Sequence, residues 1–149
     1  MAIDTNRIKY QLNLLDKYYH RLKEKQSISK EEFLKDADIQ AIVERNFQLA
    51  IECCLNIGTH LIAALSLEYA EDYGTVFMRL AQGKIISAEF GKKLVNMAKF
   101  RNLLVHVYWE IDSEKVYHNL RNNLEDFKDF ARHILKFLEK VASDPSSDN

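Results

Sequence analysis

The chain has 149 residues, a length that favours a single domain, and its formal net charge of -1 excludes a globally basic surface for nucleic acid or an anionic membrane. Hydrophobic residues make up 47% of the sequence beside one proline and four glycines, which excludes a disordered chain and disfavours a β-rich fold with many turns. The composition therefore predicts an all-α domain built from long helices.

The first expected helix is capped by Asp4 or Thr5 and runs to about Lys25. Large apolar side chains recur along it every three or four residues, the spacing of one buried helix face; they are Ile8, Leu12, Leu15, Tyr19 and Leu22. Ser29, followed three residues later by Glu32, matches the capping box, in which each side chain satisfies a free backbone N–H. A short helix is therefore expected to begin there.

A long apolar helix is predicted next, over about 39–67, after a cap at Asp36 or Asp38. It contains polar side chains at helical spacing, which favours a buried helix of a soluble bundle over a membrane span. Residues 68–72 link it to another helix that ends near Gly83, because glycine is common at helix C-termini.

Ser87 is expected to open a further helix that runs through Tyr108. A last helix is predicted to begin at Asp112 or Ser113 and to run to about Ala142. Long helices joined by short links pack side by side in alternating directions. The predicted fold is therefore an antiparallel helical bundle of four to five main helices.

The predicted domain covers 1–142, and the polar tail 143–149 is expected to be disordered. The beginning of the chain lacks the basic-then-apolar order of a secretory signal. Cys53 and Cys54 are adjacent, so they cannot form an ordinary disulfide and are expected to be small buried apolar side chains. These features predict a cytoplasmic location.

One stripe of the long helix is polar, about 120° wide; it consists of Arg45, Gln48, Glu52, Asn56, Thr59 and His60. Most of the remaining circumference is apolar, from Ile42 to Ile62. The stripe either faces solvent or lines a shared cavity in which Glu52 pairs with a cation. The sequence leaves both readings open.

Arg101 lies in the middle of an apolar arc of its helix; the arc consists of Phe90, Leu94, Met97, Ala98, Leu104, Val105 and Tyr108. An unpaired guanidinium there would cost several kcal/mol, so an anion is expected beside it. That anion is either a structural partner such as Glu52 or a bound phosphate. Asn102 and His106, four residues apart, share a neighbouring helix face.

The segment around this arginine is locally basic. Between residues 79 and 101 there are six Lys or Arg side chains and one acid, Glu89, which leaves a local charge of about +5. Lys92, Lys93 and Lys99 are therefore candidate RNA-binding residues, with an ordinary solvated face as the alternative. The five histidines are scattered and the cysteines lack zinc spacing, so neither a metal nor a cofactor is predicted.

The segment Arg101-Asn102-Leu103-Leu104-Val105-His106-Val107-Tyr108 carries the R-N-x-x-x-H-x-Y form of the HEPN superfamily motif. The chain resembles the HepT branch, the toxin half of HepT–MntA toxin–antitoxin pairs. The resemblance covers most of the chain, and the other residues that carry it are Arg45-Asn46-Phe47-Gln48, Glu52, Phe77, Leu80, Gly83, Ile111-Asp112 and Val116-Tyr117.

The resemblance implies a homodimeric HEPN-like bundle that acts as the endoribonuclease toxin of a type VII system without a metal ion. Arg101 and His106 would be its catalytic pair, with Asn102 and Glu52 in support. An MntA-like nucleotidyltransferase antitoxin would transfer AMP from ATP to Tyr108 and so neutralise the toxin.

The chemistry of RNA suits these residue types. Its 2'-OH supplies the nucleophile, so a base, an acid and a cation for the phosphate are enough, and a two-fold dimer offers two histidines and two arginines. Two other readings stay open at this point. One is a non-catalytic nucleotide-binding or docking partner of a nucleotidyltransferase, and the other is a structural dimer in which Arg101 only pairs with Glu52.

Overall fold

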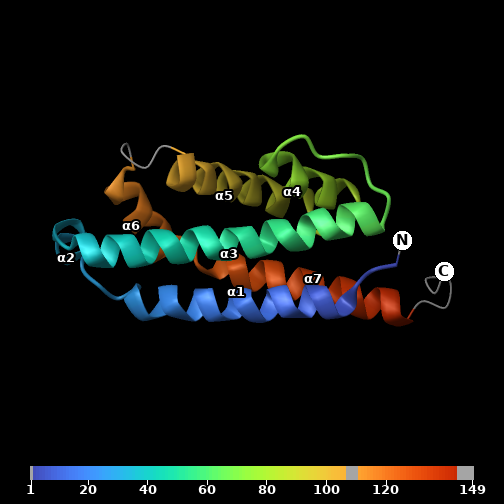
Figure 1. The fold of residues 1–149 in the computed structure, drawn as a ribbon, viewed down its shortest axis with the longest axis horizontal. Helices are drawn as coiled ribbons and strands as arrows, with labels where there is room; N and C mark the ends of the chain where they lie inside the picture. The colour runs from blue at the N-terminus through green and yellow to red at the C-terminus, as the bar shows by residue number, and fades with distance from the viewer. Residues whose placement is uncertain (1, 107–110, 144–149) are drawn as a thin grey trace.

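The structure is a computed structural model that describes residues 2–106 and 111–143, and in these ranges the chain forms seven α-helices and no β-strand (Figure 1). The helices are α1 (Thr5–Lys25), α2 (Lys30–Lys35), α3 (Ala37–Ala64), α4 (Tyr73–Gln82), α5 (Ala88–His106), α6 (Ser113–Asn122) and α7 (Glu125–Ser143). The predicted all-α class is confirmed.

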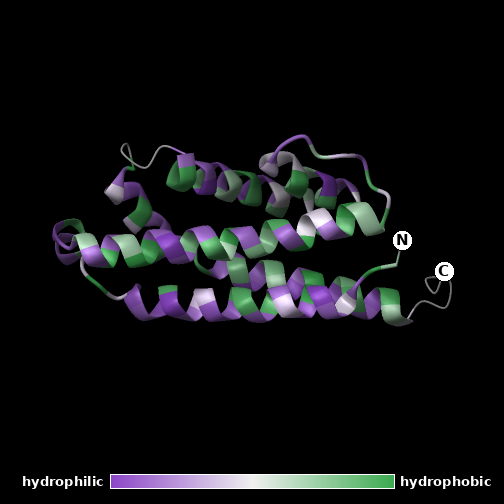
Figure 2. Cartoon of the chain, viewed as in Figure 1, coloured by the Kyte–Doolittle hydropathy of each residue, from purple (hydrophilic) through white to green (hydrophobic). Residues whose placement is uncertain are grey.

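Helix α3 is the centre of the bundle, since it contacts each of the other six described helices. It runs antiparallel to α1, while α4 and α5 pack together along its other side (Figure 1). α7 packs on α1 and α3, and the short helices α2 and α6 lie together at one end (Figure 1). Green apolar and purple polar positions therefore alternate around the long helices, because each helix turns one face inward (Figure 2).

The core is apolar and rich in phenylalanine. Among its fully buried side chains are Phe33, Phe77, Phe127 and Phe130, which come from three helices, α2, α4 and α7. Four of the five apolar side chains predicted for the first helix are buried, and Leu12 is half-buried. Cys53 and Cys54 are both free thiols buried in this core, as predicted.

The predicted helix starts are confirmed by their capping hydrogen bonds. Asp4, Ser29, Asp36 and Asp112 each accept a backbone N–H of the following helix through a side-chain oxygen. The donors lie at Arg7 (3.1 Å), Glu32 (3.1 Å), Ile39 (3.1 Å) and Glu114 (3.0 Å). The local sequence therefore sets where these helices begin.

The predicted last helix is wrong as one piece, because the chain leaves the helical path at 123–124 and forms α6 and α7. Asn123 ends α6, where its side-chain amide donates to Asn119 Oδ1 at 2.7 Å. Asparagine side chains compete with the backbone for hydrogen bonds, which favours such breaks. The seven described helices exceed the predicted four to five for this reason, and because the prediction covered the main helices and not the short helix α2.

The end of α3 differs from prediction, whereas α4 ends at Gln82 with Gly83 as its C-cap, as predicted. α3 ends at Ala64 rather than near 67, because Ser66 adopts a left-handed backbone with φ of 54°. After α4 the left-handed residue is Lys84, with φ of 61°, while Gly83 has φ of -80°. Gly83 is instead suited by its small size, since a Cβ there would lie 3.0 Å from the Leu67 side chain.

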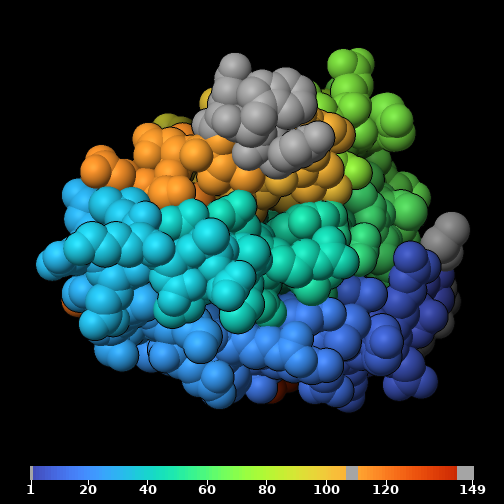
Figure 3. Space-filling model, turned by 60° about the vertical axis from the view of Figure 1, so that its left-hand side comes forward, coloured from blue at the N-terminus to red at the C-terminus, as the bar shows by residue number. Residues whose placement is uncertain are grey.

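α3 is long and apolar enough to cross a membrane by length and composition, but 61% of that window is buried inside the bundle. The core helix of a globular protein meets the same two criteria. Figure 3 shows that α3 nevertheless presents a broad band at the surface, between α1 on one side and α5 and α6 on the other. α7 ends at Ser143, and the rest of the predicted tail lies outside the described residues.

Candidate functional site

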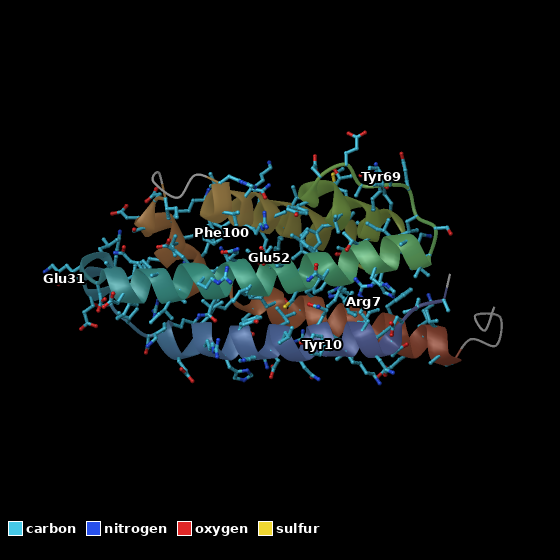
Figure 4. The ribbon with its side chains drawn as sticks, viewed as in Figure 1. Arg7, Tyr10, Glu31, Glu52, Tyr69 and Phe100 are labelled. Atoms are coloured by element: carbon cyan, nitrogen blue, oxygen red, sulfur yellow. The ribbon has the colours of Figure 1, made fainter. Side chains whose placement is uncertain are left out.

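The anion that pairs with Arg101 is a carboxylate of the same chain, that of Glu52. Arg101 Nη2 donates to Glu52 Oε1 at 2.8 Å, which joins α5 to α3. Glu52 lies in the middle of α3, where Figure 4 labels it. The two side chains are 11% and 30% exposed, so the pair is largely shielded from water. The predicted need for an anion is satisfied by Glu52, and the guanidinium has a fixed position before any ligand binds.

Three further side chains hold this pair. Gln48 donates from Nε2 to the same Glu52 oxygen at 3.2 Å, and Asn102 Oδ1 accepts from Arg101 Nη1 at 3.3 Å. The Tyr73 ring lies under the guanidinium, 4.8 Å from Cζ to the ring centroid. Arg101 Nε is buried and has no hydrogen-bond partner in the described part of the chain. A guanidinium has five N–H donors, so this one keeps donating capacity beyond its internal partners.

Asn102 and His106 lie beside an open hollow of about 760 Å³ where α5 meets the start of α4 and of α6. Its lining residues are Glu71, Asp72, Tyr73, Lys99, Asn102, Leu103, His106 and Lys115. The four-residue spacing predicted a shared face for the amide and the imidazole, and both line this hollow. His106 is exposed at the last position of α5, where a ligand has access to it.

The hollow is lined by both acidic and basic side chains. The acids are Glu71 and Asp72, and hydrogen bonds from the Thr75 hydroxyl (2.7 Å) and N–H (2.8 Å) lower the pKa of Asp72. That carboxylate therefore remains charged in mild acid. Lys99 and Lys115 also line the hollow, so an anion would be attracted to the lysines and repelled from the acids.

Not every predicted residue joins this hollow. Arg101 is five residues before His106, about 140° around the helix, and it is absent from the hollow's lining. Lys99 lines the hollow, whereas Lys92 and Lys93 are exposed elsewhere on α5. Tyr108 lies outside the described residues. One copy of the chain therefore presents its imidazole and its guanidinium in different directions.

The polar stripe of α3 divides along its length. Arg45, Asn56 and Thr59 are exposed, whereas Glu52 is drawn inward by Arg101, so each of the two readings of the stripe describes part of it. His60 Nε2 accepts the Asp4 backbone N–H at 2.9 Å and fixes the chain before α1. Ile42, near the start of α3, was assigned to the apolar side but is 44% exposed.

Two residues of the site were not found from the sequence. Tyr73 begins α4 and Lys115 lies in the first turn of α6, so neither shares a helix with the motif. The cap at Asp72 fixes where α4 starts and was the one local signal near Tyr73. Within residues 2–106 and 111–143, no group of three or more His, Cys, Asp or Glu side chains is arranged to hold a metal ion.

Comparison with known proteins places this geometry in a family. The model of the family described as "Ribonuclease HepT-like" matches residues 15–134. The "tRNA nuclease HepT" of Aphanizomenon flos-aquae is 28% identical over 131 residues, which cover 88% of this chain and 89% of that protein. The "mRNA nuclease HepT" of Shewanella oneidensis is 31% identical over 99 residues, 66% of this chain and 74% of that one.

Solved structures show the same fold. The tri-AMPylated HEPN toxin of Shewanella oneidensis, in complex with its MNT antitoxin, has a TM-score of 0.82 at 26% identity and covers 89% of this chain and 98% of its own. A toxin–antitoxin structure with AMP-PNP has a TM-score of 0.80 at 25% identity and covers 87% and 98%. The helical arrangement described above is therefore that of known toxins.

Proposed function

Because the chain belongs to the HepT-like family of ribonucleases, we propose that it is the endoribonuclease toxin of a HEPN–MNT toxin–antitoxin pair and cleaves RNA without a metal ion. The similar proteins are named as a tRNA nuclease and an mRNA nuclease, which supports a ribonuclease of either substrate class. The observation that carries the proposal is Arg101, a nearly buried guanidinium that Glu52 orients and whose Nη1 and Nη2 each carry an N–H beyond the bonds to Asn102 and Glu52.

The reaction uses the chemistry already in RNA. A base takes the proton of the 2'-OH, the 2'-oxygen attacks the adjacent phosphorus, and the bond to the 5'-oxygen breaks as an acid protonates that oxygen. The products are a 2',3'-cyclic phosphate and a 5'-hydroxyl end. Histidine performs both proton transfers near neutral pH, which is the role assigned to His106. Arg101 stabilises the charge that develops on the phosphate, and Asn102 orients the substrate or the imidazole.

The site is completed by a second copy of the chain. One copy supplies one motif histidine, whereas a two-fold dimer supplies a base and an acid together with two arginines. Two large apolar side chains that line the hollow, Tyr73 and Leu103, are each 41% exposed, and Met78 on α4 is 48% exposed. Exposed apolar side chains of this kind suit burial against a partner, which supports facing α5 helices in the dimer.

The first experiment incubates the purified protein with RNA in EDTA. The expected products carry 2',3'-cyclic phosphate ends, and added Mg²⁺ is not required for their formation. His106→Ala abolishes cleavage, while His20→Ala, a change of an exposed histidine on α1, retains it. A rate in His106→Ala equal to that of the unchanged protein rejects the assignment.

The composite site is tested with mixed dimers. Copies carrying His106→Ala and a purification tag are combined with unchanged copies, and dimers holding one of each are isolated. If one cleft needs both histidines, the mixed dimer loses nearly all activity. If each copy works alone, the mixed dimer keeps about half of it, and the two-histidine mechanism is excluded.

The proposed antitoxin is an MntA-like nucleotidyltransferase that transfers AMP from ATP to Tyr108 in the cytoplasm. A toxin–antitoxin complex with an AMPylated toxin is known among the similar structures, which supports this partner. AMP adds bulk and negative charge, which would oppose phosphate binding beside Arg101.

Intact mass after co-expression should increase by one or more AMP units, and Tyr108→Phe should remove the addition at that residue. A stable complex without RNA cleavage by the free protein would favour a docking partner instead.

A further inference from the structure

A second hollow adjoins the one beside Asn102 and His106, which we call the motif hollow. Two lysines lie between the two hollows. The second hollow has a volume of about 450 Å³, within the range of small-ligand sites, and lies between α3, α5, α6 and α7. Lys99 and Lys115 line both hollows, so the two adjoin at this pair of charges. A chain of nucleotides that leaves the motif hollow would pass between these lysines and enter the second one.

The floor of the second hollow is aromatic. Phe47, Phe100 and Phe127 line it, with the Phe47 ring 5.3 Å from Phe100 and 6.2 Å from Phe127 between centroids. These three residues are only 3%, 6% and 1% exposed with the hollow included, so they close its bottom with a small apolar surface and not with an open ring face. A flat ring that reaches the bottom of the hollow would meet apolar atoms there.

The polar lining of the hollow includes four side-chain amides. Four asparagines line it, from α5, α6 and the junction before α7; they are Asn96, Asn119, Asn122 and Asn123. Asn119 Oδ1 accepts from Asn123 Nδ2 at 2.7 Å, which leaves the Asn119 NH₂ donors for another partner. Asn122 donates to the His118 carbonyl oxygen at 2.9 Å. Asn96 is exposed on α5. An amide offers a donor and an acceptor side by side, the pattern that matches the edge of a base.

The charges of the second hollow suit an anion at its entrance. Three lysines line it, Lys93, Lys99 and Lys115, against one carboxyl group, Asp126. Burial raises the pKa of Asp126 despite the neighbouring Lys93. The positive side chains thus outnumber the acid, which favours a phosphate beside an amide-lined pocket.

We propose that this hollow is a base-binding subsite, which holds the nucleobase of a nucleotide next to the cleaved bond while Lys99 and Lys115 hold the intervening phosphate. The inference rests on the proposed ribonuclease function, and it names a determinant of where the RNA is cut. Asn96 and Asn119 are its specificity-determining residues. Because the bases differ in their donor and acceptor pattern, the subsite gives a preference for one base at a flanking position.

The experiment compares oligoribonucleotides that differ only in the base immediately 5' or immediately 3' of the cleaved bond. The unchanged protein should show kcat/KM values that differ by about tenfold between the best and worst base at one of the two positions. The double change Asn96→Ala, Asn119→Ala should reduce that ratio to about twofold or less. Asn13→Ala, an exposed asparagine on α1, is the matched control and should keep the ratio.

Thermal unfolding establishes that the double variant folds, and Asn96→Ala alone replaces it if it does not. A base preference that persists in the folded variant, or its absence from the unchanged protein, overturns the subsite. If no RNA is cleaved at all, the proposed function fails, and the subsite is then decided by binding. For that arm the same oligonucleotides carry a 2'-deoxy nucleotide at the bond, and their Kd is measured by fluorescence anisotropy.

In the binding arm, a Kd that depends on the base and loses this dependence in the asparagine variant supports the subsite. A Kd independent of the base overturns it. Free AMP separates a pocket for RNA from one for a mononucleotide, since both contain a base and a phosphate. If the variant weakens AMP binding while the base preference for RNA persists, the hollow is a mononucleotide pocket and the inference is wrong.

Discussion

Two helix–helix contacts of this bundle differ in how completely their polar groups are hydrogen-bonded. Between α1 and α7, the Tyr19 hydroxyl donates to Glu125 Oε1 at 2.7 Å, and Lys23 lies 3.5 Å from the same oxygen. Between α3 and α5, Arg101 pairs with Glu52, yet its Nε is buried without a partner in the described part of the chain. In the first contact the single O–H donor of the tyrosine is bonded, whereas in the second some N–H donors of the arginine have no acceptor among the described residues.

This difference separates a contact that stabilises the fold from one that prepares a binding site. A closed hydrogen bond over a buried ring stabilises the helix pair and offers nothing to a ligand. A guanidinium that an internal carboxylate orients, and whose N–H groups are not all used, can bind an anion without first being repositioned. Changes at the α3–α5 contact should therefore affect activity more than stability, and changes at the α1–α7 contact should do the opposite.

The largest effect is expected from His106→Ala. Loss of the proton-transfer group should lower kcat by about a thousandfold, within the usual range for general acid–base catalysis. Because His106 is exposed at the end of α5, the melting temperature should stay within about 1 °C of that of the unchanged protein. Single-turnover cleavage and calorimetry measure the two quantities. A variant with a much lower melting temperature would make the activity loss uninformative about chemistry.

Arg101→Met should lower kcat by about a hundredfold, because it removes the cation that we propose stabilises the phosphate. It also leaves the Glu52 carboxylate without its partner, which destabilises the fold. Adding Glu52→Gln removes that charge, so the double variant should regain stability without regaining activity. If activity returns together with stability, Arg101 is a structural residue and the catalytic assignment fails.

Much of the α3–α5 contact follows from the sequence. The helical phase puts Arg101 among apolar side chains, where an anion is required, and Glu52 lies on the one polar stripe of a long apolar helix. The choice between Glu52 and an external phosphate is set by the alignment of α5 on α3. That alignment depends on packing along the whole interface, so no local pattern contains it.

Other features depend on groups that the motif does not include. Tyr73 reaches the guanidinium from the start of α4, and Lys115 reaches the hollow from α6. The break at 123–124 that separates α6 from α7 shows the same limit, since helical periodicity continues across it. Capping residues were predictable because their hydrogen bonds are local, as at Ser29 and Asp112.

An intermediate effect is expected at Lys99, which lines both hollows. Lys99→Ala should raise KM for RNA by about tenfold and reduce the dependence of binding on salt by about one counterion. Lys92→Ala, an exposed change on the same helix at a residue that lines neither hollow, is the matched control. Titrations of RNA binding at several salt concentrations give both slopes. Equal slopes for the two variants would show that charge on α5 acts only at long range.

The smallest effect is expected at the closed contact between α1 and α7. Tyr19→Phe removes one hydrogen bond to Glu125, so it should lower the free energy of unfolding by about 1 kcal/mol near neutral pH and leave cleavage unchanged. Tyr10→Phe, on the same helix but 62% exposed, should do neither. Burial and the bond to Glu125 raise the pKa of Tyr19 to about 12, while the bond from Tyr19 lowers the pKa of Glu125.

The sign of the pH dependence follows from these two shifts. The lowered carboxyl pKa means that the contribution of Glu125 is present above the usual carboxyl range and is lost as the pH falls through its folded value. The raised phenol pKa means that the contribution of Tyr19 is complete below about pH 10 and is lost as the pH rises towards about 12. The difference in unfolding free energy between the unchanged protein and Tyr19→Phe should therefore be constant from about pH 6 to pH 9 and shrink in acid. A difference that grows in acid would show that the tyrosine bonds to something other than the Glu125 carboxylate. The α1–α7 contact would then no longer be an example of a fully hydrogen-bonded helix contact.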